Sequence, residues 1–141
     1  MELFFEILEK LTVRTIEYLR TNLQMVDVET NYEIEAKSIV IYKSHTSLID
    51  LTNQLDATVG MSVSDEVAFT MVKNFIFGQV QDDILKELES ENLAETLNVT
   101  LGNIIKDIDL VKDGAIVDIS TPYVPQSKVL KIAPNGTMIV S

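Results

Sequence analysis

The chain has 141 residues and a formal net charge of −11 at pH 7. This acidic balance argues against nucleic acid or an anionic membrane surface as the partner, because both require basic patches. The absence of cysteine excludes disulfides, thiolate zinc sites and cysteine nucleophiles. With 46% hydrophobic and 23% charged residues, the composition is that of a globular protein large enough for one domain with a real core.

The N-terminal part of the chain has no targeting pattern. No apolar run reaches transmembrane length, and acidic side chains stand where a signal peptide would have basic ones. The cytoplasm is therefore the expected compartment. Apolar residues at helical spacing predict a first helix over residues 2–22 that packs on the core.

The pattern then changes to that of strands. Residues 26–36 alternate between apolar and polar side chains, which predicts a half-buried strand with one solvated face. A metal site built from three acidic residues of that face is disfavoured, since no turn gathers their carboxylates; these residues are Asp27, Glu29 and Glu33.

Three further strands are predicted at 38–43, 47–55 and 56–63, with turns between them, and such short sequential strands favour an antiparallel meander. The first turn, near residues 43–46, contains the only histidine of the sequence. His45 is interpreted as a polar loop residue, because polar side chains are common in turns.

Two helical regions follow the strands. Ser64 precedes two acidic residues and indicates the start of a helix over about 65–77, which Gly78 would close. Residues 82–107 are predicted to form one long helix, because neither proline nor glycine marks a break near its start. A short helix followed by a second one is the alternative, since the apolar positions in 84–88 do not extend the later pattern smoothly.

The remaining sequence favours strands. Residues 115–124 predict a strand that Pro122 and Pro125 confine to an edge, a bulge or an exit from pairing. Residues 128–133 and 137–140 flank an Asn-Gly pair, which predicts a terminal hairpin. The order of elements predicts an α+β fold, with long helices packed on one face of an antiparallel β-sheet. No linker is evident, so residues 1–141 are expected to form a single domain.

The predicted helix from Glu91 to Ile105 has an unusual polar face. Its apolar seam comprises Leu93, Leu97, Leu101, Ile104 and Ile105. The opposite face has Glu91, Glu95, Asn98 and Gly102, with Asn92 and Asn103 nearby. Asn and Gly each cost about 0.5–1 kcal/mol relative to Ala inside a helix. Such departures from local preference are expected at functional or tightly packed sites.

Glu95 and Asn98 are three residues apart, so a helix places them on one face. Together they present a carboxylate and a carboxamide on a rigid element. The spacing E-x-x-N is common, however, and on spacing alone a solvated helix face explains it.

The residues around this pair add a family resemblance. The run formed by Glu95, Asn98, Gly102 and Asn103 resembles the signature helix of the CheC/CheX phosphatase family of bacterial chemotaxis. Glu91 stands four residues before the pair, where the family has a small or acidic residue.

The resemblance extends from about residue 47 to residue 124. It includes the strand pair SLIDLTNQL–DATVGMSVS and the helix DEVAFTMVKNFIFG. Pro122 lies about two dozen residues after Asn98, in a strand, ISTPYV, similar to the family's. No second E-x-x-N occurs on the other predicted helices, so the chain resembles the single-site CheX rather than the double-site CheC.

The resemblance implies a CheC-like fold and a phosphatase that acts on the aspartyl-phosphate of a CheY-like receiver domain. The family inserts this helix into the receiver's active site, where Asn98 would orient the attacking water and Glu95 would contact the receiver's lysine. Gly102 is interpreted as a position of close approach, against the sheet or the partner. Asn103 would cap backbone groups or contact the partner, and Glu91 and Pro122 would support the site.

The resemblance also bears on cofactors and assembly. No cofactor or metal is expected in this chain, because the receiver supplies its own Mg²⁺ and acidic residues. A homodimer through sheet edges is expected, with the terminal strands and residues 26–36 as candidates. Two alternatives stay open: a non-catalytic module of the same fold that binds receivers, and a structural domain whose polar helix face is only solvated.

Overall fold

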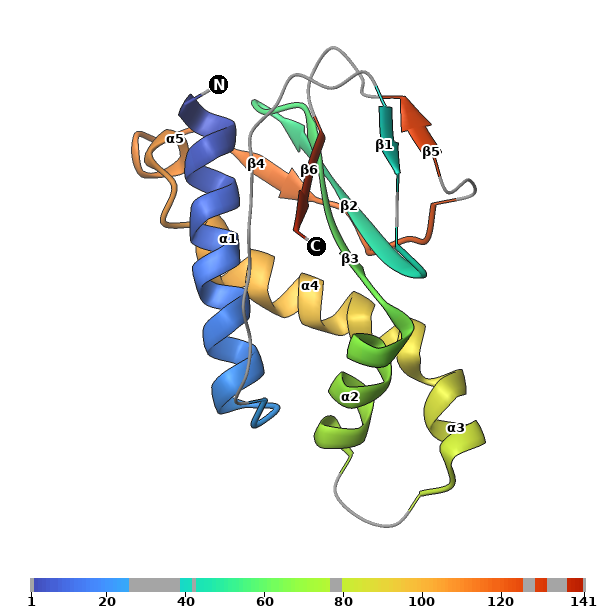
Figure 1. The fold of residues 1–141 in the computed structure, drawn as a ribbon. Helices are drawn as coiled ribbons and strands as arrows, with labels where there is room; N and C mark the ends of the chain where they lie inside the picture. Colours follow the sequence, from blue (N-terminus) through green and yellow to red (C-terminus); the bar gives the residue numbers. More distant parts are fainter. Residues whose placement is uncertain are drawn as a thin grey trace.

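The computed structural model describes residues 2–25, 39–41, 43–76, 80–125, 129–131 and 137–140. Helices α1 and α4 lie on one face of a four-stranded β-sheet, while α2 and α3 extend beyond one end of it (Figure 1). The predicted α+β class is therefore confirmed. Among the described residues, no helix is both long enough and apolar enough to cross a membrane.

Helix α1 (Glu2–Thr21) confirms the predicted first helix. Its apolar residues face α4 and the sheet, and Ile7 and Leu11 are fully buried. A polar contact adds to this packing: the Lys10 ammonium donates a hydrogen bond to the carbonyl of Asp107, just after α4, at 2.7 Å. A long N-terminal helix is thus held by a segment about a hundred residues later in the chain.

The sheet has the strand order β4-β2-β3-β6. Its central pair, β2 (His45–Asn53) and β3 (Ala57–Val63), is antiparallel, and β4 (Val117–Ile119) pairs antiparallel with β2. Strand β6 (Thr137–Val140) runs parallel to β3. The predicted antiparallel pairing of 47–55 with 56–63 is confirmed, and β4 extends it on the other side of β2. The predicted meander is wrong for residues 38–43, because the strand there does not join this sheet. Strand β6 makes the described sheet mixed.

The predicted terminal hairpin is wrong. Strand β5 (Val129–Lys131) pairs antiparallel with β1 (Ile39–Ile41) in a separate two-stranded sheet, whereas β6 pairs with β3. An Asn-Gly turn is a local preference, and here β3 offers β6 a free row of hydrogen-bonding groups that β5 would otherwise supply. The turn residues 132–136 lie outside the described residues, as do residues 26–36 with the predicted strand and its three carboxylates.

Helix α2 (Asp65–Phe75) begins as the sequence predicts. Ser64 has extended backbone angles, and its hydroxyl accepts a hydrogen bond from the amide of Val67 at 3.3 Å. Such a cap satisfies one of the amides that a helix start leaves without a partner. The helix ends at Phe75, and the predicted cap at Gly78 lies outside the described residues.

The predicted single long helix is wrong, and the alternative with a short preceding helix is correct. Helix α3 (Asp82–Glu87) is separated from α4 (Glu89–Ile105) by Leu88. The Leu88 amide bonds the carbonyl of Leu85, at 3.0 Å, so the last turn of α3 tightens to an i→i−3 bond. A short helix α5 (Asp109–Lys112), which the sequence did not indicate, follows α4.

Strand β4 is an edge strand, which confirms the role expected of the proline-containing segment. The amide of Ser120 bonds the carbonyl of Asp50 at 2.9 Å, and Tyr123 and Leu48 exchange two backbone hydrogen bonds of 2.8 and 2.9 Å. Pro122, which has no amide hydrogen, lies between these two points of pairing. The segment therefore follows the sheet edge with an interruption at the proline.

Candidate functional site

Helix α4 presents one exposed polar face. Glu91, Glu95, Asn98 and Gly102 are spaced by four, three and four residues, and all four are exposed. This spacing keeps them along one side of the helix. Within the described part of the chain, the side chains of Glu95 and Asn98 form no hydrogen bond or ion pair, so their polar groups are available to a partner.

The opposite side of α4 is firmly anchored. The predicted apolar seam is confirmed by Leu93, Leu97 and Leu101, which are buried against the core, whereas Ile105 is only half-buried. The helix packs against α1, α2 and β2. Because close-packed side chains leave little freedom for the backbone, the exposed face of α4 is a rigid platform.

Two buried threonines widen this anchored side. The hydroxyl of Thr96 donates to the carbonyl of Asn92 at 2.8 Å, and the hydroxyl of Thr100 donates to the carbonyl of Thr96 at 2.7 Å. Each hydroxyl is thus satisfied within its own helix, which allows a polar residue to be buried at little cost. The sequence pattern indicates only the apolar seam, because a helical period is recognised from apolar residues and not from buried threonines.

A groove lies between α2 and the first two turns of α4. It has a volume of about 290 Å³ and is lined by Val72, Phe75, Ile76, Leu88, Glu91, Asn92 and Glu95. Phe75 is 48% exposed despite its large apolar ring. Asn92 is only 7% exposed, and its Oδ1 atom has no hydrogen-bond partner among the described residues. The groove is therefore continuous with the exposed face of α4 and combines apolar walls with acceptor groups.

The supporting residues predicted from the sequence occupy different surroundings. A Cβ atom placed on Gly102 would meet no described residue within 4 Å, so close approach of Gly102 to the described sheet is wrong and close approach to a partner remains as the interpretation. Asn103 accepts a hydrogen bond at its Oδ1 atom from Nε of Arg14, at 3.0 Å. Pro122 belongs to the sheet edge rather than to α4.

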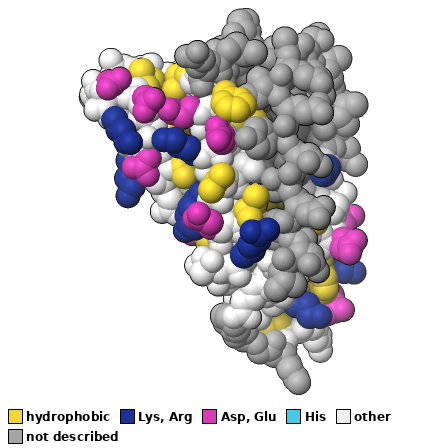
Figure 2. All heavy atoms as spheres, turned by 60° about the vertical axis from the view of Figure 1, so that its left-hand side comes forward, with side chains coloured by type: hydrophobic (Ala, Val, Ile, Leu, Met, Phe, Trp, Pro, Cys, Tyr) yellow, Lys and Arg dark blue, Asp and Glu magenta, His cyan; other side chains and the backbone are white. Residues whose placement is uncertain are grey.

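A second, larger groove runs along α1 and the end of α4. It has a volume of about 600 Å³ and is lined by Phe5, Glu6, Glu9, Lys10, Val13, Arg14, Glu17, Ile104 and Asp107. Neither Glu95 nor Asn98 is among these residues. Basic and acidic side chains are interspersed on the side of the molecule that bears α1 (Figure 2). The groove itself is lined by four acidic and two basic side chains, so it presents both signs of charge with an acidic excess.

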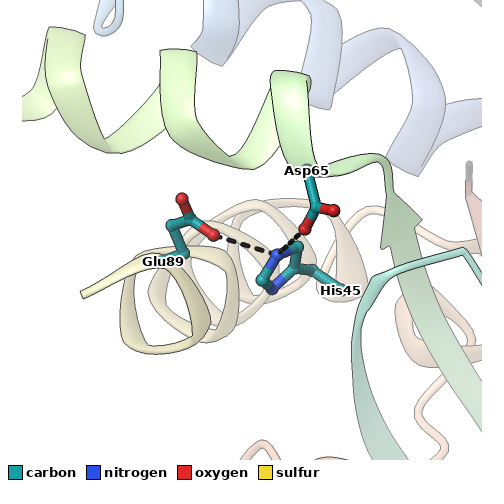
Figure 3. Close-up of side chains that lie close together, drawn as sticks. All are labelled: His45, Asp65 and Glu89. Atoms are coloured by element: carbon teal, nitrogen blue, oxygen red, sulfur yellow. Dashed lines mark hydrogen bonds and ion pairs between the residues drawn. The ribbon is translucent and has the colours of Figure 1, made fainter. Parts of the chain in front are cut away.

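The structure corrects the interpretation of His45. This residue begins β2 instead of lying in a turn, and its ring meets the carboxylates of Asp65 and Glu89 (Figure 3). The three residues come from separate elements and lie twenty and twenty-four positions apart in the chain. No spacing in the sequence could reveal this group, because it forms only when β2, α2 and α4 pack together.

Comparison with known proteins agrees with this architecture. The family model described as chemotaxis phosphatase CheX matches residues 45–140 of the chain, which is more than half of its length. A search of curated proteins finds no match.

Several solved structures share the fold. A chemotaxis protein CheX from Desulfovibrio desulfuricans superimposes with a TM-score of 0.67 at 16% identity, covering 91% of this chain and 82% of that one. A CheX–CheY–BeF3–Mg+2 complex from Borrelia burgdorferi gives a TM-score of 0.63 at 18% identity, covering 91% and 90%. CheX from Vibrio vulnificus gives 0.61 at 17%, covering 91% and 82%. From the family match and this shared fold together, the chain belongs to the chemotaxis phosphatase CheX family.

Proposed function

We propose that this chain hydrolyses the aspartyl-phosphate of a CheY-like receiver domain. The observation that supports it is the exposed Glu95–Asn98 pair on a rigidly anchored helix in a member of the chemotaxis phosphatase CheX family. A relative of the same fold forms a solved complex with CheY. Helix α4 is the element that would enter the receiver's active site.

In this proposal Asn98 positions the attacking water. The water oxygen attacks phosphorus in line with the bond to the aspartyl oxygen; that bond breaks, and inorganic phosphate and the free carboxylate are released. The carboxamide of Asn98 both donates and accepts hydrogen bonds, so it can fix the orientation of the water. Phosphoryl transfer depends mainly on positioning and charge stabilisation, so one well-placed amide is sufficient help.

Glu95 holds the docked receiver. Glu95 lies one turn before Asn98 on the same face of α4. Its carboxylate would meet the cationic side chain of the receiver's lysine. Glu91 adds a second negative charge one turn earlier, which strengthens attraction to a basic partner surface. The receiver contributes its own Mg²⁺, which neutralises charge on the phosphoryl oxygens.

The groove between α2 and α4 extends this docking surface. Glu91 and Glu95 line the groove and also belong to the exposed face of α4. A receiver that meets this face would therefore also reach the groove, where one of its apolar side chains would pack against Phe75. Buried apolar anchors of this kind supply much of the energy of protein interfaces.

We also propose a cytoplasmic homodimer joined at a sheet edge, and β6 is the terminal strand that lies at an edge of the described sheet.

The test is the decay of a phosphorylated receiver in the presence of the chain. The receiver is charged with a small phosphodonor and Mg²⁺, freed of donor, and followed by phosphate release. The native chain accelerates the decay, and Asn98→Ala reduces the acceleration by about 10²–10³-fold, the loss typical of one preorganised polar group. Asn22→Ala, at an exposed asparagine at the end of α1, serves as the matched control and leaves the rate unchanged.

Binding measurements separate the alternatives. The phosphatase proposal requires that Asn98→Ala still binds a beryllofluoride-activated receiver, since its role is to place water rather than to dock. Binding without accelerated decay by the native chain would instead establish the non-catalytic receiver-binding module. Absence of both binding and acceleration, with every receiver of the source organism, would leave a solvated helix face as the explanation of the pair.

A further inference from the structure

The ends of three elements meet at His45. The Nε2 atom of its ring lies 2.7 Å from Oδ1 of Asp65 and 2.9 Å from Oε2 of Glu89 (Figure 3). His45 is the first residue of β2, Asp65 the first of α2 and Glu89 the first of α4. One potential ligand atom from each residue lies within 4.8 Å of the other two.

We propose that His45, Asp65 and Glu89 form a binding site for one divalent transition-metal ion of the zinc class. Imidazole nitrogen and carboxylate oxygen together are donors that Zn²⁺ accepts, whereas Mg²⁺ and Ca²⁺ prefer oxygen ligands alone. Three protein ligands leave a fourth position of a tetrahedral ion for water. This site is separate from the Glu95–Asn98 pair and does not depend on the proposed phosphatase activity.

Charge balance favours a cation at this point. The Glu89 side chain is only 7% exposed, and burying a carboxylate is costly unless a cation or hydrogen-bond donors compensate it. Nε2 of His45 is the shared contact of both carboxylates, yet one ring nitrogen has at most one hydrogen to donate. Within the described residues, neither carboxylate forms an ion pair with lysine or arginine. A divalent ion would neutralise both carboxylates at once.

The geometry requires only a small adjustment. Ligand atoms held at about 2.0–2.2 Å from a tetrahedral zinc ion lie roughly 3.3–3.5 Å apart. The nitrogen–oxygen distances of 2.7 and 2.9 Å must therefore lengthen by roughly 0.4–0.8 Å. Asp65 can make most of this adjustment, because its side chain is 79% exposed and is not confined by packing. The same exposure leaves a route for the ion and its water.

The position of the site indicates a structural role. Glu89 lies nine residues before Asn98 on α4, and at 1.5 Å per residue this corresponds to about 13 Å along the helix. The ion would therefore lie too far away to touch a phosphoryl group held at Asn98. It would instead fix the start of α4 against β2 and α2, and so stabilise the helix whose exposed face is the candidate docking surface.

Direct titration tests the site, and the sequence makes the test unusually clean. The chain has a single histidine and no cysteine, so a tag-free protein offers one imidazole and no thiolate to Zn²⁺. Calorimetry is expected to give one ion per chain, and the unique ring resonances of His45 are expected to shift in NMR spectra. Zinc at about a hundredfold excess over its dissociation constant should raise the unfolding midpoint by roughly 10 °C.

Substitutions separate a built site from general attraction of cations to an acidic chain. His45→Gln and Glu89→Gln are each expected to weaken zinc binding by at least tenfold. Circular dichroism checks that each variant is folded. Asp82→Asn, at the exposed first residue of α3, is the matched control and should bind zinc as the native chain does. Unchanged zinc affinity in His45→Gln, or no saturable zinc binding by the native chain, would overturn the proposal.

Discussion

Arg14 on α1 donates a hydrogen bond from Nε to Oδ1 of Asn103 on α4, at 3.0 Å and across 89 positions of the sequence. This contact gives Asn103 a role inside the protein, in joining two helices. Because the bond is exposed, we expect Arg14→Ala and Asn103→Ala each to lower the free energy of unfolding by about 0.5–1 kcal/mol. The double variant should lose less than the sum of the two, since both remove the same bond.

Urea denaturation of the four proteins of this cycle measures the coupling. The phosphatase assay on Asn103→Ala is the accompanying control, and we expect its rate to equal that of the native chain. A large loss of rate in a variant of nearly native stability would assign Asn103 to the partner surface instead.

Gly102 allows a second prediction, because stability and binding should move in opposite directions. Space around its Cα atom is open, so Gly102→Ala should raise the free energy of unfolding by about 0.5–1 kcal/mol through better helix propensity. If the receiver backbone approaches this position closely, the added methyl group should weaken receiver binding. Chemical denaturation and a binding titration of the same variant measure the two effects.

The contrasting control is Gly114→Ala. Gly114 has a φ of +102°, a backbone region that alanine adopts only with strain, so this substitution should destabilise the fold by about 1 kcal/mol or more. Receiver binding by Gly102→Ala at native strength would show that the close-approach interpretation is wrong.

Phe75 provides a third prediction, concerning the groove between α2 and α4. Phe75→Ala should change stability little, since the ring is 48% exposed, but should weaken receiver binding by about tenfold to thirtyfold through loss of an apolar anchor. Phe5→Ala is a matched control, because Phe5 is 45% exposed on α1, away from this groove. Surface plasmon resonance with an activated receiver compares the two variants; equal affinities would remove the groove from the docking surface.

Ser64 gives a fourth prediction, for the stability of α2. Its hydroxyl caps the helix through the amide of Val67, so Ser64→Ala should lower the free energy of unfolding by about 1 kcal/mol. Ser64→Asp retains an acceptor oxygen and should recover most of this loss. Thermal or urea unfolding of the two variants measures the effect. If the hydroxyl does not cap the helix, both variants would have the stability of the native chain.

The sequence predicted those elements in which local pattern and tertiary packing agree. Helix α1 and the β2–β3 pair have strong periodicity, the start of α2 has a capping serine, and all three are confirmed. The helix that bears Glu95 and Asn98 was also found, and its exposed face is the one that the sequence had indicated. The roles of the two side chains stay predictions, as does the single domain over residues 1–141.

The errors arise where contacts with a remote part of the chain determine the local structure. The break at Leu88 has no glycine or proline to mark it, so only the packing of α3 and α4 reveals it. Strand β6 pairs with β3 instead of with β5, its neighbour in the sequence, and a local turn signal cannot indicate such a long-range pairing. His45 likewise acquires its two carboxylate neighbours from α2 and α4. The sequence pattern puts Asn92 near the exposed polar face, but its side chain is buried and lines the groove between α2 and α4. Polarity alone cannot show this burial.

The packing of α1 against α4 has a consequence for synthesis on the ribosome. Ile7 and Leu11 bury their side chains in a core that α4 helps to form, yet α4 is translated some 89 residues after α1, the separation of Arg14 from Asn103. At about 5–20 residues per second, the apolar side of α1 waits roughly 5–20 s for its partner. We therefore expect chaperones that shield apolar segments to bind the nascent helix until the chain is long enough to fold.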